Sequence, residues 1–296
     1  MNAFAKKIIS TLIILMTWVV INDQWLQDWE ISSALRSAVK DEGQNFNHII
    51  LGDSHGERIW LDHSLNFSSG GAALIFQFVK LLKTASHLEG ANHVWIGIGP
   101  HNFSDLPIDR IENNFENYLT GNRAELAMLF TGLPVDTFSL SFHFNRLLGE
   151  CLPAQKIGYQ TGRLQTKDNQ FSADATEMRL TKHRVLQPHW FREHPSTTGV
   201  LQRIATMTDK QVYLVGTSLH KSYFSRIHPS GWNAYKKFLN ELAENTRIQY
   251  IAVEDARLPD SFFTDADHLN DHGMQWLTDT LTKVFEAQND LANRLN

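Results

Sequence analysis

The sequence of 296 residues contains a single cysteine, Cys151, and no excess of basic residues. One cysteine cannot form an internal disulfide, and it excludes zinc or iron–sulfur sites that are built from several cysteines. With 27 Lys and Arg against 32 Asp and Glu, the formal net charge is −5. A chain with this charge lacks the basic surface by which general nucleic-acid binders follow phosphates. We therefore expect no nucleic-acid partner, and we also expect no metal and no other cofactor.

A basic and then apolar segment opens the chain. Lys6 and Lys7 precede an apolar run at Ile8–Ile21, which is the arrangement of a signal sequence. Because no small-residue cleavage site follows, we predict an uncleaved signal anchor over residues 1–25, continued by a linker helix over 26–46. The basic side should stay in the cytoplasm, so the rest of the chain should lie outside it. Secretion after cleavage and a buried helix of a soluble protein are the alternatives.

Apolar runs rich in β-branched residues recur along the rest of the chain, each stopped by Gly, Asp or Ser. Nearly continuous apolar strands are typical of a parallel sheet that is covered on both faces. Amphipathic helical patterns lie between them, at Ala72–His87, Pro229–Asn245 and Asp271–Leu291. This alternation predicts one α/β domain over residues 47–296, a doubly wound three-layer sandwich with a mostly parallel five-stranded sheet. The expected strands are His48–Leu51, Leu65–Ser68, His93–Ile98, Gln211–Val215 and Ile248–Val253.

Residues from about 131 to 195 break this alternation. They are rich in aromatic, histidine, arginine and glycine residues and show no clean period. An irregular stretch of this length inside a compact domain is usually a functional insertion. We therefore expect an irregular insertion here, which is either a cap over a site or a surface excursion.

The pentad Gly52-Asp53-Ser54-His55-Gly56 follows the first expected strand directly. As Gly-x-Ser-x-Gly it matches the nucleophile elbow of α/β-hydrolases, but in that fold the serine follows several strands. Asp53 and His55 also match the first block of calcineurin-type metallophosphoesterases. The sequence lacks the two further blocks of that family, and two ligands cannot hold a catalytic metal pair. Neither family accounts for the pentad.

A second polar motif, Asp265-Ala266-Asp267-His268, precedes the last expected helix. A serine hydroxyl is a weak nucleophile until a general base takes its proton. We expect His268 to be that base for Ser54, with Asp265 orienting its ring and stabilising the imidazolium. Asp267 is the neighbouring alternative to Asp265. Strand termination and helix capping are the non-catalytic alternatives for these residues.

Together the two motifs resemble the SGNH/GDSL hydrolase superfamily, whose fold is flavodoxin-like. Two intermediate blocks of that family have counterparts here, in the same order. They are Asn66-Phe67-Ser68-Ser69-Gly70-Gly71-Ala72 and Gly99-Pro100-His101-Asn102. The second block has one residue more than the Gly-x-Asn-Asp pattern of the family.

This resemblance implies a Ser-His-Asp site with an oxyanion hole. The expected donors are the backbone N–H groups of Ser54 and Gly71 and the side-chain amide of Asn102. Three further residues adjoin these blocks and are expected to contact substrate. They are Asp53, His55 and His101.

A site of this kind transfers an acyl group from an ester, to water in an esterase or to another hydroxyl in a transferase. Membrane-anchored members of the SGNH superfamily in bacterial envelopes resemble enzymes that add or remove acetyl groups on exported polysaccharides. We therefore expect O-acetyl transfer to, or removal from, an extracytoplasmic polysaccharide, on the periplasmic side of a bacterial inner membrane. The expected partners are an acyl-ester donor, a carbohydrate acceptor and an envelope polysaccharide biosynthesis complex. The alternatives are an inactive scaffold that binds polysaccharide and a lipid or carboxyl ester hydrolase.

Overall fold

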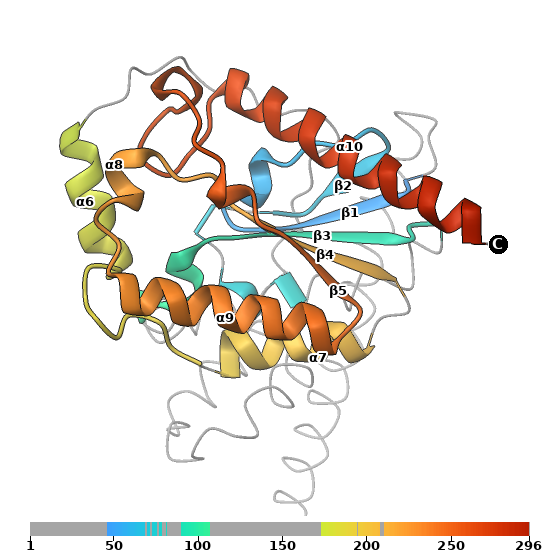
Figure 1. The fold of residues 1–296 in the computed structure, drawn as a ribbon, viewed down its shortest axis with the longest axis horizontal. Coiled ribbons are helices and arrows are strands. Elements are labelled where there is room, and N and C mark those ends of the chain that lie inside the picture. Colours follow the sequence, from blue (N-terminus) through green and yellow to red (C-terminus); the bar gives the residue numbers. More distant parts are fainter. Residues whose placement is uncertain are drawn as a thin grey trace, which may run out of the picture.

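The computed structural model describes residues 46–106, 173–193, 195–207 and 210–295, apart from 69, 72, 76, 79–80 and 82–89. These residues form a five-stranded, all-parallel sheet with helices on both faces (Figure 1). The predicted α/β three-layer architecture is thereby confirmed. The strands are β1 (His48–Gly52), β2 (Ser64–Asn66), β3 (His93–Ile98), β4 (Gln211–Gly216) and β5 (Ile248–Ile251).

The strand order is β2-β1-β3-β4-β5. The chain leaves β1 for β2 on one side and then returns to place β3 on the other side of β1. Strands β1 and β3 pair in register from His48 opposite His93 to Gly52 opposite Gly97. In open parallel sheets, ligands bind outside the carboxyl ends of the strands where the order reverses. Ser54, which follows β1, and His101, which follows β3, therefore emerge at this switch point.

The two faces of the sheet bury alternate residues of each strand, as the period of a strand requires. On one face Ile49 and Leu51 pack with helices α7 (Val200–Met207) and α9 (Pro229–Asn245). On the other face Ile50 packs with α10 (Asp271–Leu295). Figure 1 shows α10 along one side of the sheet and α7 and α9 along the opposite side. Each fully buried aliphatic side chain contributes about 1.5–3 kcal/mol to folding, so both layers hold the strand ends in place.

Helix α6 (Ala173–His183) lies within the stretch that was expected to be irregular, so that expectation is wrong for these residues. The buried positions of α6 are Thr176, Leu180 and His183, which follow the i, i+4, i+7 spacing of one helix face. Two of the three are polar, and an apolar periodicity therefore cannot reveal the helix. The rest of the expected insertion up to residue 172 lies outside the described residues.

Other boundaries differ slightly from the expected ones. Strand β5 ends at Ile251, and a 3₁₀ turn at Val253–Asp255 follows, so the strand is shorter than predicted. In the expected helix Ala72–His87, the described residues Leu74, Ile75, Gln77, Phe78 and Leu81 are helical. The remaining short elements are α8 (Lys221–Phe224), a π-helical turn at Pro195–Gly199 and 3₁₀ turns at Gly56–Arg58, Pro100–Phe103 and Asp260–Phe262.

The expected anchor over residues 1–25 and the linker helix up to residue 45 lie outside the described part of the chain. Within the part that is described, no helix combines the length and the apolar character needed to span a membrane.

Candidate active site

A tight backbone turn presents Ser54 at the carboxyl end of β1. Gly52 has a φ of +145°, which side-chain-bearing residues rarely adopt. A Cβ on Gly52 would lie 2.9 Å from both the Gly56 Cα and the Gly97 carbonyl oxygen. Glycine at this position therefore lets the turn pack directly against β3. The turn leaves Ser54 partly exposed while its neighbours Asp53 and His55 are buried.

Ser54, His268 and Asp265 form a continuous hydrogen-bonded chain. The Ser54 Oγ lies 2.8 Å from His268 Nε2, and His268 Nδ1 lies 2.9 Å from Asp265 Oδ2. The two ends of this chain are more than 200 residues apart in sequence. Sequence analysis named these three residues, and the fold brings them together in the order that general-base activation of a serine requires.

The loop before α10 positions its own acid and base. Asp265 Oδ1 accepts hydrogen bonds from the backbone N–H groups of Asp267, at 3.1 Å, and His268, at 3.0 Å. The Thr264 N–H donates to the His268 carbonyl at 2.9 Å, which closes the loop. Burial by itself would raise the pKa of Asp265, but its hydrogen bond and charge interaction with His268 lower it. Asp265 is therefore ionised at neutral pH.

Arg179 of α6 reaches the same carboxylate from a different part of the chain. Its Nη2 donates to Asp265 Oδ2 at 2.8 Å, and its Nε lies 3.4 Å from Asp267 Oδ1. Burial opposes the charge, but the carboxylates of Asp267 and Asp265 raise the pKa of the guanidinium. Sequence analysis missed Arg179, because no motif surrounds it and its helix has a largely polar buried face.

The two intermediate blocks approach the serine turn. A Cβ on Gly70 would lie 4.0 Å from the Ser54 Cβ, and the adjacent Gly71 has a φ of +78°. The predicted donor Gly71 therefore follows a glycine that lies near the serine side chain. The positive φ at Gly71 is available to glycine at little cost.

Asn102 is held from both ends of its amide. Its Oδ1 accepts the Gly99 N–H at 2.7 Å, and its Nδ2 donates to Asp53 Oδ2 at 3.1 Å. An amide nitrogen carries two hydrogens, so the bond to Asp53 occupies one of the two donors. The predicted oxyanion residue is therefore fixed to the serine turn by its own side chain.

Behind Ser54 lies a row of four closely spaced histidine rings, two pairs of which are stacked and one tilted, which we call the histidine column. The ring centroids of successive members are 4.8, 4.7 and 4.6 Å apart. Two buried carboxylates, Asp53 and Asp267, flank the rings. The four rings in order are His268, His55, His101 and His183.

The residues expected to contact substrate belong to this column. Asp53, His55 and His101 are each at most 4% exposed. Asp53 bonds to both rings, through Oδ1 to His55 Nδ1 at 3.0 Å and through Oδ2 to His101 Nε2 at 2.5 Å. In this structure the three side chains support the serine turn from inside the domain and do not face solvent. Their burial gives no support to direct substrate contact.

Charge in the column follows from these contacts. Burial alone would raise the pKa of Asp53, but the His101 and His55 rings hold it well below its ordinary value. Burial would lower the pKa of His55, yet Asp53 and Asp267 raise it to about 10. Burial dominates at the other end and lowers the pKa of His183 to about 2. The column therefore holds an imidazolium at His55, between two carboxylates, and a neutral ring at His183.

Asp267 has a different environment from Asp265, two residues earlier. Within the described part of the chain, neither of its carboxylate oxygens takes part in a hydrogen bond. The nearest ring nitrogens are His55 Nε2 at 3.4 Å and His268 Nδ1 at 3.5 Å, followed by His183 Nε2 at 3.7 Å. Burial would raise the pKa of Asp267, but His268 and His55 hold it well below its ordinary value. The second candidate for orienting His268 is thus a buried anion held mainly by charge.

Three sets of side chains in the column have possible metal-ligand atoms within 4.8 Å of one another. Imidazole nitrogens bind metals through lone pairs that lie in the ring plane, so rings that share an ion must point towards a common centre. Successive rings of the column are stacked or tilted, with interplanar angles of 17°, 33° and 30°, so their lone pairs point side by side instead. Several ring nitrogens are also hydrogen-bonded already. The geometry therefore favours a hydrogen-bonded column over a metal centre. The three sets are Asp53, His55 and His101; His55, Asp267 and His268; and His101, His183 and Asp267.

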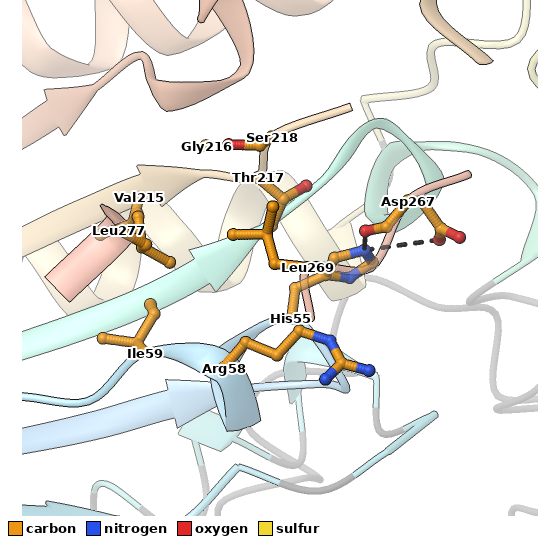
Figure 2. A pocket seen from close by; sticks show the side chains of 10 residues that line it. All are labelled: His55, Arg58, Ile59, Val215, Gly216, Thr217, Ser218, Asp267, Leu269 and Leu277. Carbon is orange, nitrogen blue, oxygen red and sulfur yellow. Dashed lines mark hydrogen bonds and ion pairs between the residues drawn. The ribbon is translucent and has the colours of Figure 1, made fainter. Parts of the chain in front are cut away.

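A small pocket adjoins the column beyond the end of β4. Figure 2 shows His55 and Asp267 at one end of it and the apolar side chains of Ile59, Val215 and Leu277 at the other. Its polar lining includes hydroxyl oxygens of Thr217 and Ser218 that form no hydrogen bond within the described residues. Ser54 does not line this pocket.

No protein-family model matches the chain, and no curated protein matches it. The fold and the side chains at its carboxyl edge define a doubly wound α/β domain with a Ser-His-Asp arrangement. A shared fold does not determine function, which has to be argued from the site.

Proposed function

We propose that this protein is a serine-dependent acyltransferase or esterase in which Ser54 is the nucleophile. The observation that carries the proposal is the hydrogen-bonded chain from the Ser54 Oγ through His268 to Asp265. Nucleophile, base and orienting carboxylate are each within hydrogen-bond distance, which is the geometric test for such a site. The lowered pKa of Asp265 supports the same assignment, because an ionised carboxylate stabilises the imidazolium.

The chemistry proceeds in two halves. In the first, His268 Nε2 takes the Ser54 proton while Oγ attacks the ester carbonyl, and the negative charge that develops needs preorganised donors. His268 then gives the proton to the leaving alkoxide, which leaves an acyl group on Ser54. In the second half His268 takes a proton from water or from an acceptor hydroxyl, which attacks the acyl-enzyme. The bond between the acyl carbon and the Ser54 Oγ then breaks, and His268 returns the proton to this oxygen. Water yields an esterase and a sugar hydroxyl a transferase.

For the substrate we propose an O-acyl carbohydrate, with O-acetyl transfer to or from an extracytoplasmic polysaccharide. Support comes from the resemblance of the sequence motifs and from the predicted N-terminal anchor. The anchor would place the domain at the outer surface of a bacterial inner membrane. An inactive polysaccharide-binding scaffold is less favoured, because a protein without catalysis has no need to keep the serine, base and carboxylate in hydrogen-bonded order.

Hydrolysis of p-nitrophenyl acetate by the full chain tests the proposal. We expect Ser54→Ala to lower kcat/KM by at least about 10³-fold, as removal of a triad nucleophile does. Ser225→Ala, which changes an exposed serine on the surface, is the matched control and should retain wild-type activity. Equal activity of Ser54→Ala and wild type would refute the nucleophile. Repeating the assay with an acetylated oligosaccharide donor and an unacetylated acceptor separates transfer from hydrolysis.

A further inference from the structure

Helix α6 brings a cation to the triad that the proposed mechanism does not use. Arg179 Nη2 donates to Asp265 Oδ2 at 2.8 Å, and the same nitrogen lies 3.2 Å from His268 Nδ1. His268 Nδ1 must carry a hydrogen if Nε2 is to accept the proton of Ser54. Two N–H donors, one from a fixed cation and one from the base, therefore share a single carboxylate.

The other groups around His268 come from its own loop and from the segment after β1. Asp265 bonds to Nδ1, and Asp267 Oδ1 lies 3.5 Å from it. The His55 ring stacks on the His268 ring with centroids 4.8 Å apart. His55 is itself a cation by its raised pKa, and Arg58 adds another that interacts electrostatically with Asp265. Arg179 places a nitrogen 3.2 Å from His268 Nδ1.

We propose that Arg179 is a positioning residue that holds Asp265 in place and opposes protonation of His268, so that the base functions at lower pH. This inference rests on the proposed function of the same site. The guanidinium would oppose protonation of His268 in two ways. Its charge repels the imidazolium, and its hydrogen bond draws electron density of Asp265 away from His268.

The size of the effect follows from distance and exposure. In a partly buried site, a unit charge at about 4 Å from an ionisable ring strongly changes the free energy of protonating that ring. The Arg179 side chain is 29% exposed, and solvent screening reduces the effect. We expect removal of the guanidinium to raise the pH at which His268 takes up a proton by about 1 unit.

The first test is the pH dependence of kcat/KM for p-nitrophenyl acetate. In Arg179→Gln the midpoint of the acidic limb should rise by about 1 pH unit. Arg179→Lys keeps the charge and should keep most of the wild-type midpoint. Lys182→Gln removes an exposed cation from the same helix and should leave the midpoint unchanged. A purely structural role predicts lower activity at every pH with no movement of the limb, and this result would overturn the proposal.

The second test needs no catalysis. Titration of the His268 ring by NMR, with its signals assigned by their loss in His268→Asn, follows protonation of the base directly. The midpoint should be higher in Arg179→Gln than in wild type by the same amount. Coincident titration curves in wild type and Arg179→Gln would overturn the role of Arg179 even if the enzyme is active. If the protein instead shows no esterase activity but the curves differ, the proposed function fails while the electrostatic effect of Arg179 stands.

Discussion

The front of the candidate site and the histidine column behind it use the same residue types in opposite ways. At the front, the Asp265 side chain is 20% exposed and accepts hydrogen bonds from the backbone, His268 and Arg179. In the column, Asp53 is 3% exposed and binds two buried rings. Groups that can gain and lose protons beside solvent are suited to acid–base catalysis. A buried set of opposite charges instead keeps its protonation state fixed. The difference predicts that variants of Ser54, His268 and Asp265 lose activity, whereas variants of the buried column residues behind His268 lose stability.

The largest expected effect is on activity, at Asp265. Asp265→Asn keeps the shape of the side chain but no longer requires the tautomer of His268 in which Nε2 is free to accept a proton. We expect kcat for ester hydrolysis to fall by about 10³–10⁴-fold, as in other triads, with a melting temperature close to that of wild type. Asp279→Asn, on the exposed side of α10, is the control. A loss of less than about tenfold would mean that Asp267 can replace Asp265. The contrast between the partly exposed and the buried carboxylates would then be wrong.

The next effect is on stability, at Asp53. Asp53→Asn removes one of two carboxylates beside the buried His55 imidazolium, and a buried charge left without its partner costs about 3 kcal/mol. The pKa of Asp53 is held well below its ordinary value, so its contribution is present above the unfolded pKa of about 3.9. Urea denaturation should therefore show the full deficit for the variant between about pH 5 and 6.5, and the deficit should decrease as the pH rises towards the His55 pKa of about 10, because the ring must then take up a proton on folding. This deficit should shrink as the pH falls below about 4. A variant as stable as wild type at pH 7 would contradict the charge assignment in the column.

The smallest effect concerns a third buried carboxylate, outside both regions. Glu254 is fully buried, and burial raises its pKa to about 7, although Lys236 opposes the rise. A raised pKa means that the stabilising, protonated form is complete below about pH 4.5 and is lost as the pH rises to about 7. Glu254→Gln removes this loss, so the variant should gain about 1–2 kcal/mol relative to wild type between pH 5 and 7. Parallel stability curves over that range would show that Glu254 stays ionised. The contrast with Asp53 shows that the partners of a buried acid, and not burial alone, set the sign of its shift.

Much of the fold could be predicted because its signals are local. Strands β1, β3 and β4 are short, nearly continuous apolar runs, and α9 spans Pro229–Asn245, the range that its periodicity predicts. The residues Ser54, Asp265 and His268 could be named because each lies in a compact motif beside a strand or helix end. Their contact across the sheet follows from parallel topology, which directs the carboxyl ends of the strands to one edge.

The rest could not be predicted because it depends on tertiary contacts. Arg179 and His183 lie on α6, and the buried face of that helix is largely polar, so no apolar period marks it. His55 and His101 were expected beside the pocket on the substrate side. Burial depends on the packing of β1, β3 and α6 together, which no local pattern records. The expected anchor over residues 1–25 stays a prediction.

The most direct test of the central claim is reaction of the folded, full-length protein with a fluorophosphonate probe, followed by peptide mass spectrometry. The probe labels a serine whose hydroxyl is activated by a base. The account predicts stoichiometric labelling at Ser54, with labelling lost in His268→Asn and retained in the exposed-histidine control His272→Asn. Absence of label at Ser54 in folded protein, or equal labelling in His268→Asn and wild type, would contradict it.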